Sequence, residues 1–380
     1  MIVMMWCYMN YKILFISAPV GAGHIRAAQA IISALGIRDK QIETRMANVF
    51  DFFNPRIGKL ILNTYLKILE LFPQLYGAAY NWGNESKLVL LGRKIISSYL
   101  ANKMEKYILE YNPRVIVCTH ATPAGLVSHL LRNNKVSIPV VAVVTDFILH
   151  RLWIYPEIQH YIVAHKGMKT FLIEQGVEHN NIKVIGIPVD ERFSLPADKL
   201  SILEKLGFYC DRKTLLIMGG GAGMLPMDKI LLCCEKMNEV IQIIVVAGSN
   251  QKMYNKLLAL QPNLRNKVKV FGYVDSIHEL MSIAQLIISK PGGMTTAETL
   301  CKGLPMIIYQ PIPGQEEGNT NYLVKARAAV RADSSSEIES ILKRLFIENS
   351  EELLDLQRSA QTISRPRAAE EIAHYIVTQV

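Results

Sequence analysis

Three glycine-containing segments combine backbone that can bind an anion with side chains that can do chemistry. The first covers residues 19–24 and ends in His24, the second covers residues 219–223, and the third runs over 289–298 and ends in Glu298. Each follows a short apolar run and precedes a helical pattern. A glycine loop that leads from a strand into a helix exposes N–H groups at the positive end of the helix dipole. We therefore expect these loops to face a phosphate or another anion.

The first loop lacks the full fingerprint of a dinucleotide-binding protein, because Arg26 stands where the third glycine belongs. This argues against an NAD-type site. His24 adds a titratable side chain at the mouth of the predicted sheet. Two interpretations stay open: a functional histidine, or a structural junction between strand and helix.

The second loop is the richer in glycine, with four glycines in five positions, including Gly220 and Gly221. Such a segment lets a ligand approach the backbone closely. The alternative interpretation is a flexible turn.

The third loop places Gly292 and Gly293 before a helix, with a threonine able to cap it and Glu298 in the first turn. A carboxylate there either stabilises the helix dipole or accepts hydrogen bonds from two neighbouring ribose hydroxyls. A polar loop, residues 311–319, follows another predicted strand and would also lie at the carboxyl ends of the strands, where open α/β sheets bind ligands. Its alternative is a solvated loop.

The elements that position these loops alternate between short apolar strands and helices, which predicts an α/β fold with mostly parallel sheets. The expected strands are 11–18, 114–118, 139–145, 161–164 and 183–185, followed after a restart by 214–218, 243–247, 268–271, 286–289 and 306–309. We infer an N-terminal domain over 1–195 and a C-terminal domain over 196–365, joined within 188–211. A last helix, 366–380, has Pro366 near its start.

The composition is that of a globular protein with a basic balance: half of the 380 residues are hydrophobic and the formal net charge is +9. Such a balance suits nucleic acid, anionic lipid or a phosphorylated ligand. No basic run with interleaved aromatic residues is present, so we do not expect nucleic acid as a partner. The six cysteines form no CxxC pair, which predicts neither a disulfide framework nor a zinc site and fits a reducing compartment.

Two segments bear on membranes. Residues 1–8 are apolar without a basic stretch before them, and we interpret them as an extension and not as a signal peptide. No run approaches the ~18–20 apolar residues that a spanning helix needs. Residues 52–110 read as helical, with eight Lys or Arg against four Asp or Glu, a net charge of +4. Their apolar stripe either packs on the N-terminal domain or contacts lipid.

The ordered motifs together resemble glycosyltransferase family 28. They are GAGH ending at His24, TDF–H–LW over 145–153, GGGAG over 219–223, FGYVD over 271–275, SKPGGMTTAE over 289–298 and PGQEEGN over 313–319. The similarity runs from about residue 11 to 332 and is greatest to the monogalactosyl- and monoglucosyl-diacylglycerol synthases. It implies the GT-B fold, two Rossmann-like domains with a cleft between them.

The resemblance implies that a UDP-sugar binds the C-terminal domain. Glu298 would hold the ribose hydroxyls and the backbone near Val274 would meet the uracil. The diphosphate would face Gly220, Gly221 and the helix that begins near Gly292 and Gly293. The remaining donor-site residues are expected to be Thr295, Gln315, Glu316 and Asn319, the last three holding the sugar and the phosphates.

The implied reaction inverts the anomeric centre and uses neither a metal nor a cofactor, with UDP-glucose or UDP-galactose as the donor substrate. The chain contains no Asp-x-Asp, the usual signature of metal-dependent transferases with the other common fold. Dipoles at helix N-termini would stabilise the charge on the leaving UDP. His24 is the favoured general base, and Asp146 is the alternative base or the residue that orients His24.

The implied acceptor is diacylglycerol, which would place the protein peripherally on the cytoplasmic face of a membrane. The basic segment 52–110 would meet an anionic membrane surface, with Arg56, Lys59 and Lys67 among its contacts. Three alternatives remain: an N-acetylglucosaminyltransferase acting on a polyprenyl-diphosphate acceptor such as lipid I, a UDP-sugar 2-epimerase, and a non-catalytic nucleotide-sugar sensor.

Overall fold

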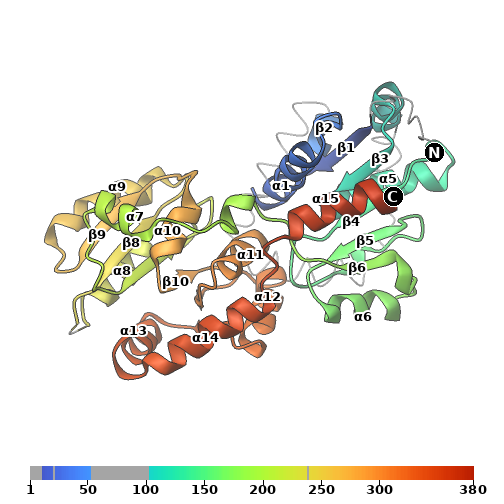
Figure 1. Cartoon of the computed structure of the whole chain (residues 1–380). Helices are drawn as coiled ribbons and strands as arrows, with labels where there is room; N and C mark the ends of the chain where they lie inside the picture. Colours follow the sequence, from blue (N-terminus) through green and yellow to red (C-terminus); the bar gives the residue numbers. More distant parts are fainter. Residues whose placement is uncertain (1–10, 20–21, 53–101, 238) are drawn as a thin grey trace, which may run out of the picture.

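The computed structural model describes residues 11–19, 22–52, 102–237 and 239–380. Two α/β domains lie side by side, each built on a six-stranded parallel sheet (Figure 1). The predicted fold class, two Rossmann-like domains, is therefore confirmed.

The sheet of the N-terminal domain is parallel throughout and has the order β2-β1-β3-β4-β5-β6. Its strands are β1 (Lys12–Ser17), β2 (Glu43–Asn48), β3 (Val115–Cys118), β4 (Val140–Val143), β5 (His160–Val163) and β6 (Ile182–Val184). The helices that follow strands include α1 (Gly23–Arg38), α5 (Ala121–Arg132) and α6 (Lys166–Glu174). The strand order reverses between β1 and β3, and ligands of open α/β sheets bind at such a switch point.

The sheet of the C-terminal domain has the order β12-β11-β10-β7-β8-β9, again all parallel. Its strands are β7 (Thr214–Met218), β8 (Gln242–Val246), β9 (Lys267–Phe271), β10 (Leu286–Ser289), β11 (Met306–Tyr309) and β12 (Ala329–Ala332). Helices between and after them are α8 (Met227–Cys234), α9 (Gln251–Leu260), α10 (Ile277–Ile283), α11 (Gly293–Cys301), α12 (Gln315–Lys325), α13 (Ser335–Lys343) and α14 (Ser350–Ile363). Here the switch point lies between β7 and β10, the strands that precede the second and third glycine loops.

The last helix, α15 (Ala368–Gln379), packs on the N-terminal domain. Ile372 and Ile376 belong to the same buried cluster as Ile31 of α1 and Phe15 of β1. The chain therefore crosses back after α14, and Figure 1 shows α15 running along the domain in which the chain began.

The central strands form where the sequence is apolar and β-branched, and they are buried along their length. The two strands absent from the sequence prediction, β2 and β12, are edge strands. The sequence of β2 is ETRMAN, and most of its residues are partly exposed. It therefore lacks the continuous apolar run by which a buried strand is predicted. The expected linker also contains a helix, α7 (Lys199–Leu206), which ends at Gly207 in the left-handed conformation.

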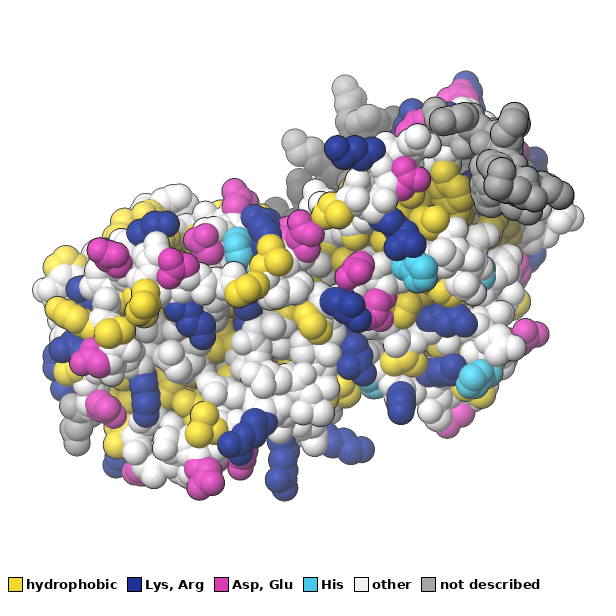
Figure 2. Space-filling view, viewed as in Figure 1, with side chains coloured by type: hydrophobic (Ala, Val, Ile, Leu, Met, Phe, Trp, Pro, Cys, Tyr) yellow, Lys and Arg dark blue, Asp and Glu magenta, His cyan; other side chains and the backbone are white. Residues whose placement is uncertain are grey.

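Residues 1–8 and most of the basic segment 52–110 lie outside the described residues. None of the helices in the described ranges is both long and apolar enough to cross a membrane. On the face drawn in Figure 2, basic and acidic side chains are interspersed over both domains. The surplus of positive charge is therefore not gathered into one patch on that face.

Candidate active site

Loops from the carboxyl ends of the two sheets meet at the domain boundary, and glycine makes this close approach possible. Any Cβ on Gly293 would collide with the carbonyl oxygen of Thr145 and lie 2.8 Å from Oδ1 of Asp146. A Cβ on Gly23 would lie 3.3 Å from the Cβ of Met294. The first and third glycine loops therefore face each other across the boundary.

His24, the second residue of α1, is held by groups at the ends of β3 and β4. Its Nδ1 lies 3.1 Å from the carbonyl oxygen of Thr119 and 2.6 Å from Oγ1 of Thr145. The Thr145 hydroxyl itself lies 3.4 Å from the same carbonyl. One arrangement satisfies all three contacts: the hydroxyl donates to the carbonyl, and Nδ1–H donates to both oxygens. This assigns the proton to Nδ1 and leaves Nε2 as an acceptor.

Burial lowers the pKa of His24 to about 4, although the Thr119 carbonyl raises it. The imidazole is therefore neutral at physiological pH, the state that a general base requires. The ring of His120 packs edge-on against it at 4.6 Å between centroids. His120 Nδ1 accepts from the backbone N–H of Thr122, and burial holds its pKa well below its usual range. Two neutral imidazoles thus stand together at the switch point of the N-terminal sheet.

Asp146 follows β4 and is surrounded by residues of α12 from the other domain. Its Oδ2 accepts from the Gln315 amide at 3.0 Å and its Oδ1 from the Asn319 amide at 3.4 Å. Burial raises the pKa of Asp146 to about 7, the Asn319 hydrogen bond lowers it, and the charge of Glu316 raises it. The contacts that orient His24 come from Thr119 and Thr145, while Asp146 contacts Gln315 and Asn319 instead.

The side chain of Asn319 joins two backbone segments in the same cluster. Its Oδ1 accepts from the N–H of Phe147 at 3.0 Å, and its Nδ2 donates to the carbonyl of Pro291 at 2.9 Å. Glu316 accepts from the N–H of Ile312 at 2.7 Å through Oε2, and burial raises its pKa. The structure thus brings Gln315, Glu316 and Asn319 together beside the Pro291 turn and the end of β4.

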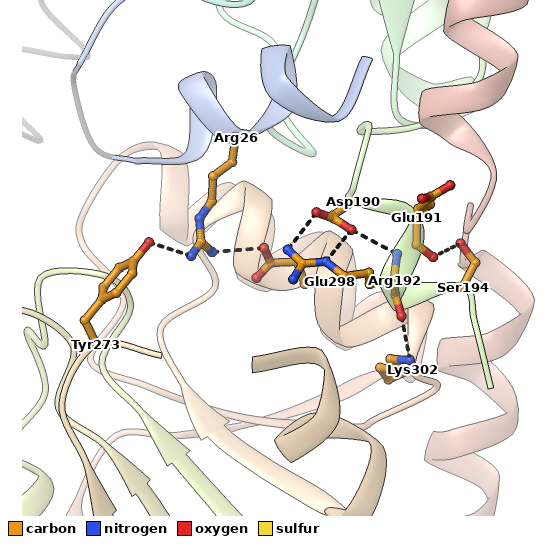
Figure 3. Close-up of polar contacts among 8 residues, drawn as sticks. All are labelled: Arg26, Asp190, Glu191, Arg192, Ser194, Tyr273, Glu298 and Lys302. Atoms are coloured by element: carbon orange, nitrogen blue, oxygen red, sulfur yellow. Dashed lines mark hydrogen bonds and ion pairs between the residues drawn. The ribbon is translucent and has the colours of Figure 1, made fainter. Parts of the chain in front are cut away.

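Glu298 lies on α11 and is almost wholly buried, with 4% of its surface exposed. Its Oε1 accepts from Nη1 of Arg26 at 3.2 Å, and Nη2 of Arg26 donates to the Tyr273 hydroxyl at 3.1 Å (Figure 3). Burial raises the pKa of Glu298 to about 7, and the Arg26 charge lowers it. A carboxylate of one domain is therefore paired with a guanidinium of the other.

Two details of α11 differ from the sequence prediction. Glu298 is the sixth helical residue and lies in the second turn, one turn beyond the predicted place. Gly292 occupies the N-cap position, and no side chain caps the helix, so the expected threonine cap is not made. The backbone N–H groups that begin α11 are thus left to other partners. Thr295 is half-buried in the first turn.

The remaining donor-site predictions lie in two loops of the C-terminal domain. Gly220 has φ of +70° and Gly221 is exposed, its position for a Cβ lying 4.0 Å from Ala22 of the first glycine loop. The turn is closed by hydrogen bonds from Gly223 N to Gly220 O and from Met224 N to Gly219 O. Val274 follows β9 and is half-buried, next to Tyr273.

Sequence reasoning missed several residues of the site: Arg26, Thr119, His120, Thr145 and Tyr273. Arg26 had a signal, since it replaces an expected glycine in the first loop. Thr145 and Tyr273 stand within quoted motifs, directly before Asp146 and Val274. Within the described residues, no group of three His, Cys, Asp or Glu side chains could hold a metal ion.

Two family models match the chain, one for each domain. The monogalactosyldiacylglycerol (MGDG) synthase model matches residues 24–189, and the glycosyltransferase family 28 C-terminal domain model matches residues 214–372. The first match begins at His24, the last residue of the first glycine loop, and includes Asp146. The second match includes the second and third glycine loops and residues 311–319.

Curated proteins and solved structures agree with these matches. The processive diacylglycerol beta-glucosyltransferase of Bacillus mycoides is 32% identical over 97% of this chain and 94% of its own length. The fold is similar to Acinetobacter baumannii MurG, with a TM-score of 0.63 at 13% identity over 97% of this chain and 99% of that one. It is also similar to Anabaena Alr3699/HepE, with a TM-score of 0.58 at 16% identity over 97% and 100% of the two chains. The chain is a GT-B glycosyltransferase of family 28 and belongs with the diacylglycerol glycosyltransferases of that family.

Proposed function

We propose that this enzyme transfers glucose from UDP-glucose to diacylglycerol at a membrane surface, with inversion to a β-glycoside. The observation that carries the proposal is the similarity at 32% identity over 97% of the chain to a protein named as a diacylglycerol beta-glucosyltransferase. Galactose is the second candidate sugar, because the model matching residues 24–189 is named for monogalactosyldiacylglycerol synthase.

The donor occupies the C-terminal half of the cleft in this proposal. Glu298 accepts from the ribose hydroxyls, and the backbone near Val274 meets the uracil. Gly220, Gly221 and the uncapped start of α11 at Gly292 and Gly293 face the diphosphate, where free N–H groups and the helix dipole favour negative charge.

Gln315, Glu316 and Asn319 hold the sugar, with Thr295 beside them. Two of these side chains, Gln315 and Asn319, donate to Asp146, which keeps their polar groups paired. Solved GT-B neighbours include Anabaena HepE in complex with UDP-glucose, which supports a UDP-sugar as the donor.

The chemical step uses His24 as general base. Its Nε2 accepts the proton of the acceptor hydroxyl while the hydroxyl oxygen attacks the anomeric carbon. The bond from that carbon to the diphosphate oxygen breaks, and UDP leaves with the bonding electrons. The N–H groups that begin α11 stabilise the charge on UDP as it develops. Asp146, the residue after Thr145, is the alternative base.

In this proposal the N-terminal domain binds the acceptor. Residues 52–110, whose net charge is +4 and whose apolar residues recur at helical spacing, supply the contact with an anionic membrane in this proposal. Most of that segment lies outside the described residues, so the proposal for it rests on its sequence.

A donor and acceptor panel tests the proposal. The purified protein is incubated with radiolabelled UDP-glucose, UDP-galactose or UDP-N-acetylglucosamine, each with diacylglycerol vesicles, lipid I vesicles or no acceptor. We expect labelled glycolipid with UDP-glucose and diacylglycerol together, and little product in the other combinations. Product only with UDP-N-acetylglucosamine and lipid I, or acceptor-free isomerisation of that donor, would overturn the proposal.

A further inference from the structure

We propose that Arg26 of the N-terminal domain is a positioning residue for the donor nucleotide, which aims the Glu298 carboxylate and keeps it in the charged form. The inference rests on the proposed role of Glu298 as the ribose-binding residue. It adds that the donor site is completed from the acceptor domain, by a side chain that lies outside the C-terminal fold.

The geometry places Arg26 at the boundary of the two domains. It lies in the first turn of α1, and its guanidinium bridges Glu298 on α11 and Tyr273 after β9, at 3.2 and 3.1 Å (Figure 3). Its guanidinium carbon also lies 5.9 Å from the centre of the Tyr273 ring. Of the ion pairs among the described residues, this pair alone joins one domain to the other.

The contact leaves the carboxylate able to bind a second partner. Arg26 donates to Oε1 of Glu298 through a single nitrogen. A carboxylate has about four lone-pair sites on its two oxygens. Arg26 and two ribose hydroxyls can therefore share the same carboxylate, provided that it is ionised, because a protonated carboxyl loses acceptor capacity.

Glu298 must be ionised to bind the ribose in this way, and its surroundings favour the protonated form. Burial and, more weakly, the Asp190 charge from the interdomain linker raise its pKa while Arg26 lowers it, and together these effects place the pKa at about 7. Asp190 is itself paired with Arg192, Oδ1 to Nε and Oδ2 to Nη2, both at 2.9 Å. Cys301, one turn along α11, carries a thiol whose pKa burial raises to about 11, so it is neutral.

Two further charged or titratable groups lie near the Asp190–Arg192 pair. Lys302, the C-cap residue of α11, donates to the carbonyls of Arg192 and Leu195 at 3.3 and 3.1 Å. His278 on α10 has its pKa lowered by burial. Arg26 is therefore the positive charge that contacts the Glu298 carboxylate directly.

The test is the pH dependence of UDP binding, measured by calorimetry from about pH 6.5 to about pH 9 on the full chain. The variants are Arg26→Ala, Arg26→Lys and Glu298→Gln, with Arg38→Ala as a matched control, because Arg38 is an exposed arginine at the far end of the same helix. Glu298→Gln has no carboxyl at position 298 to titrate. The pH dependence that its UDP binding retains therefore reports the titration of the UDP phosphate, whose second pKa is about 6.

We expect wild type and Arg38→Ala to lose affinity as the pH falls through about 7, where Glu298 takes up a proton. In Arg26→Ala that loss should begin at higher pH, with affinity falling roughly tenfold per unit by which the pKa exceeds the working pH. At the alkaline end, where Glu298 is ionised in both proteins, the difference between Arg26→Ala and wild type should be smallest, and what remains of it reflects the lost positioning contact. Arg26→Lys should restore much of the wild-type profile.

The outcomes separate the two proposals. If Glu298→Gln binds UDP like wild type at every pH, the ribose assignment fails and the Arg26 proposal falls with it. If Glu298→Gln weakens binding while Arg26→Ala follows the wild-type pH profile, the Arg26 proposal alone is contradicted. Tighter binding by Arg26→Ala would show that Arg26 competes with the nucleotide, and would also overturn it.

Discussion

The side-chain amide of Gln315 donates to the carboxylate of Asp146 at 3.0 Å, from α12 of one domain to the end of β4 in the other. A residue that we assign to the donor sugar therefore touches a candidate base of the acceptor domain. The sugar and the attacking hydroxyl would meet at this place, since each domain brings one of the two groups. Which of the two nearby bases takes the proton is open to a direct test.

Replacing His24 with Ala should lower kcat by about 10²–10⁴, the usual contribution of a general base, with little change in the affinity for UDP. Replacing Asp146 with Asn should lower kcat less, because His24 keeps its contacts with Thr119 and Thr145. Steady-state kinetics at saturating donor measure both variants. A normal kcat for His24→Ala would assign the base to Asp146.

The pH profile gives independent support. The base must be deprotonated to act, so kcat falls as the pH drops through its pKa. With His24 as base, kcat at saturating donor should persist below pH 7, because burial lowers the pKa of His24 to about 4. A fall near pH 7 that disappears in Asp146→Asn would instead indicate Asp146, whose pKa is about 7.

Gly293→Ala should impair catalysis by holding the two domains apart. The added Cβ would meet the carbonyl of Thr145, which is backbone and cannot turn aside. We expect a loss of kcat with the C-terminal domain still folded. Gly36→Ala is the control, since it adds a methyl group to α1 where no atom lies within 4 Å. That change should raise stability by about 1 kcal/mol and keep activity. Equal activity of both variants would contradict the close approach.

Activity should survive excess EDTA. The chain has no Asp-x-Asp to hold Mg²⁺ beside a diphosphate, and the N-terminus of α11 offers an alternative stabilisation of the leaving group. The measurement is glycolipid formation with EDTA and after adding Mg²⁺ or Mn²⁺. Complete loss that either ion restores would contradict this mechanism.

Membrane binding should depend on anionic lipid and on salt. Each basic residue near such a surface contributes about 1 kcal/mol, so replacing Arg56, Lys59 and Lys67 with Ser should cost about 3 kcal/mol if all three contact it. Sedimentation with vesicles of rising phosphatidylglycerol content, at low and high salt, measures this. Equal pelleting of wild type and triple variant on neutral and anionic vesicles would show that the contact lies elsewhere.

The central strands of both sheets could be predicted because burial on both faces gives a continuous apolar run, as in TLLIM of β7. β2 could not, because an edge strand with polar residues carries no such run. The helix α7 was hidden inside a segment read as linker. Its signals were the cap at Asp198 and the glycine at 207.

The residues of the candidate site also differ in whether the sequence could predict them. Glu298, Gly293 and Asn319 could be located because each stands in a local motif beside a predicted strand. Their partners could not, because they depend on how two domains dock. Arg26 and Glu298 are 272 positions apart in the sequence, and no pattern within either segment predicts their contact.

The most direct test of the account is the product made from UDP-glucose and diacylglycerol vesicles by the purified enzyme, identified by mass spectrometry and proton NMR. We predict a glucosyl-diacylglycerol with a β-anomeric linkage at the first sugar, and one UDP released for each glucose transferred. Failure to glucosylate diacylglycerol, or a product with an α-linkage, would contradict the proposed acceptor or the single in-line displacement.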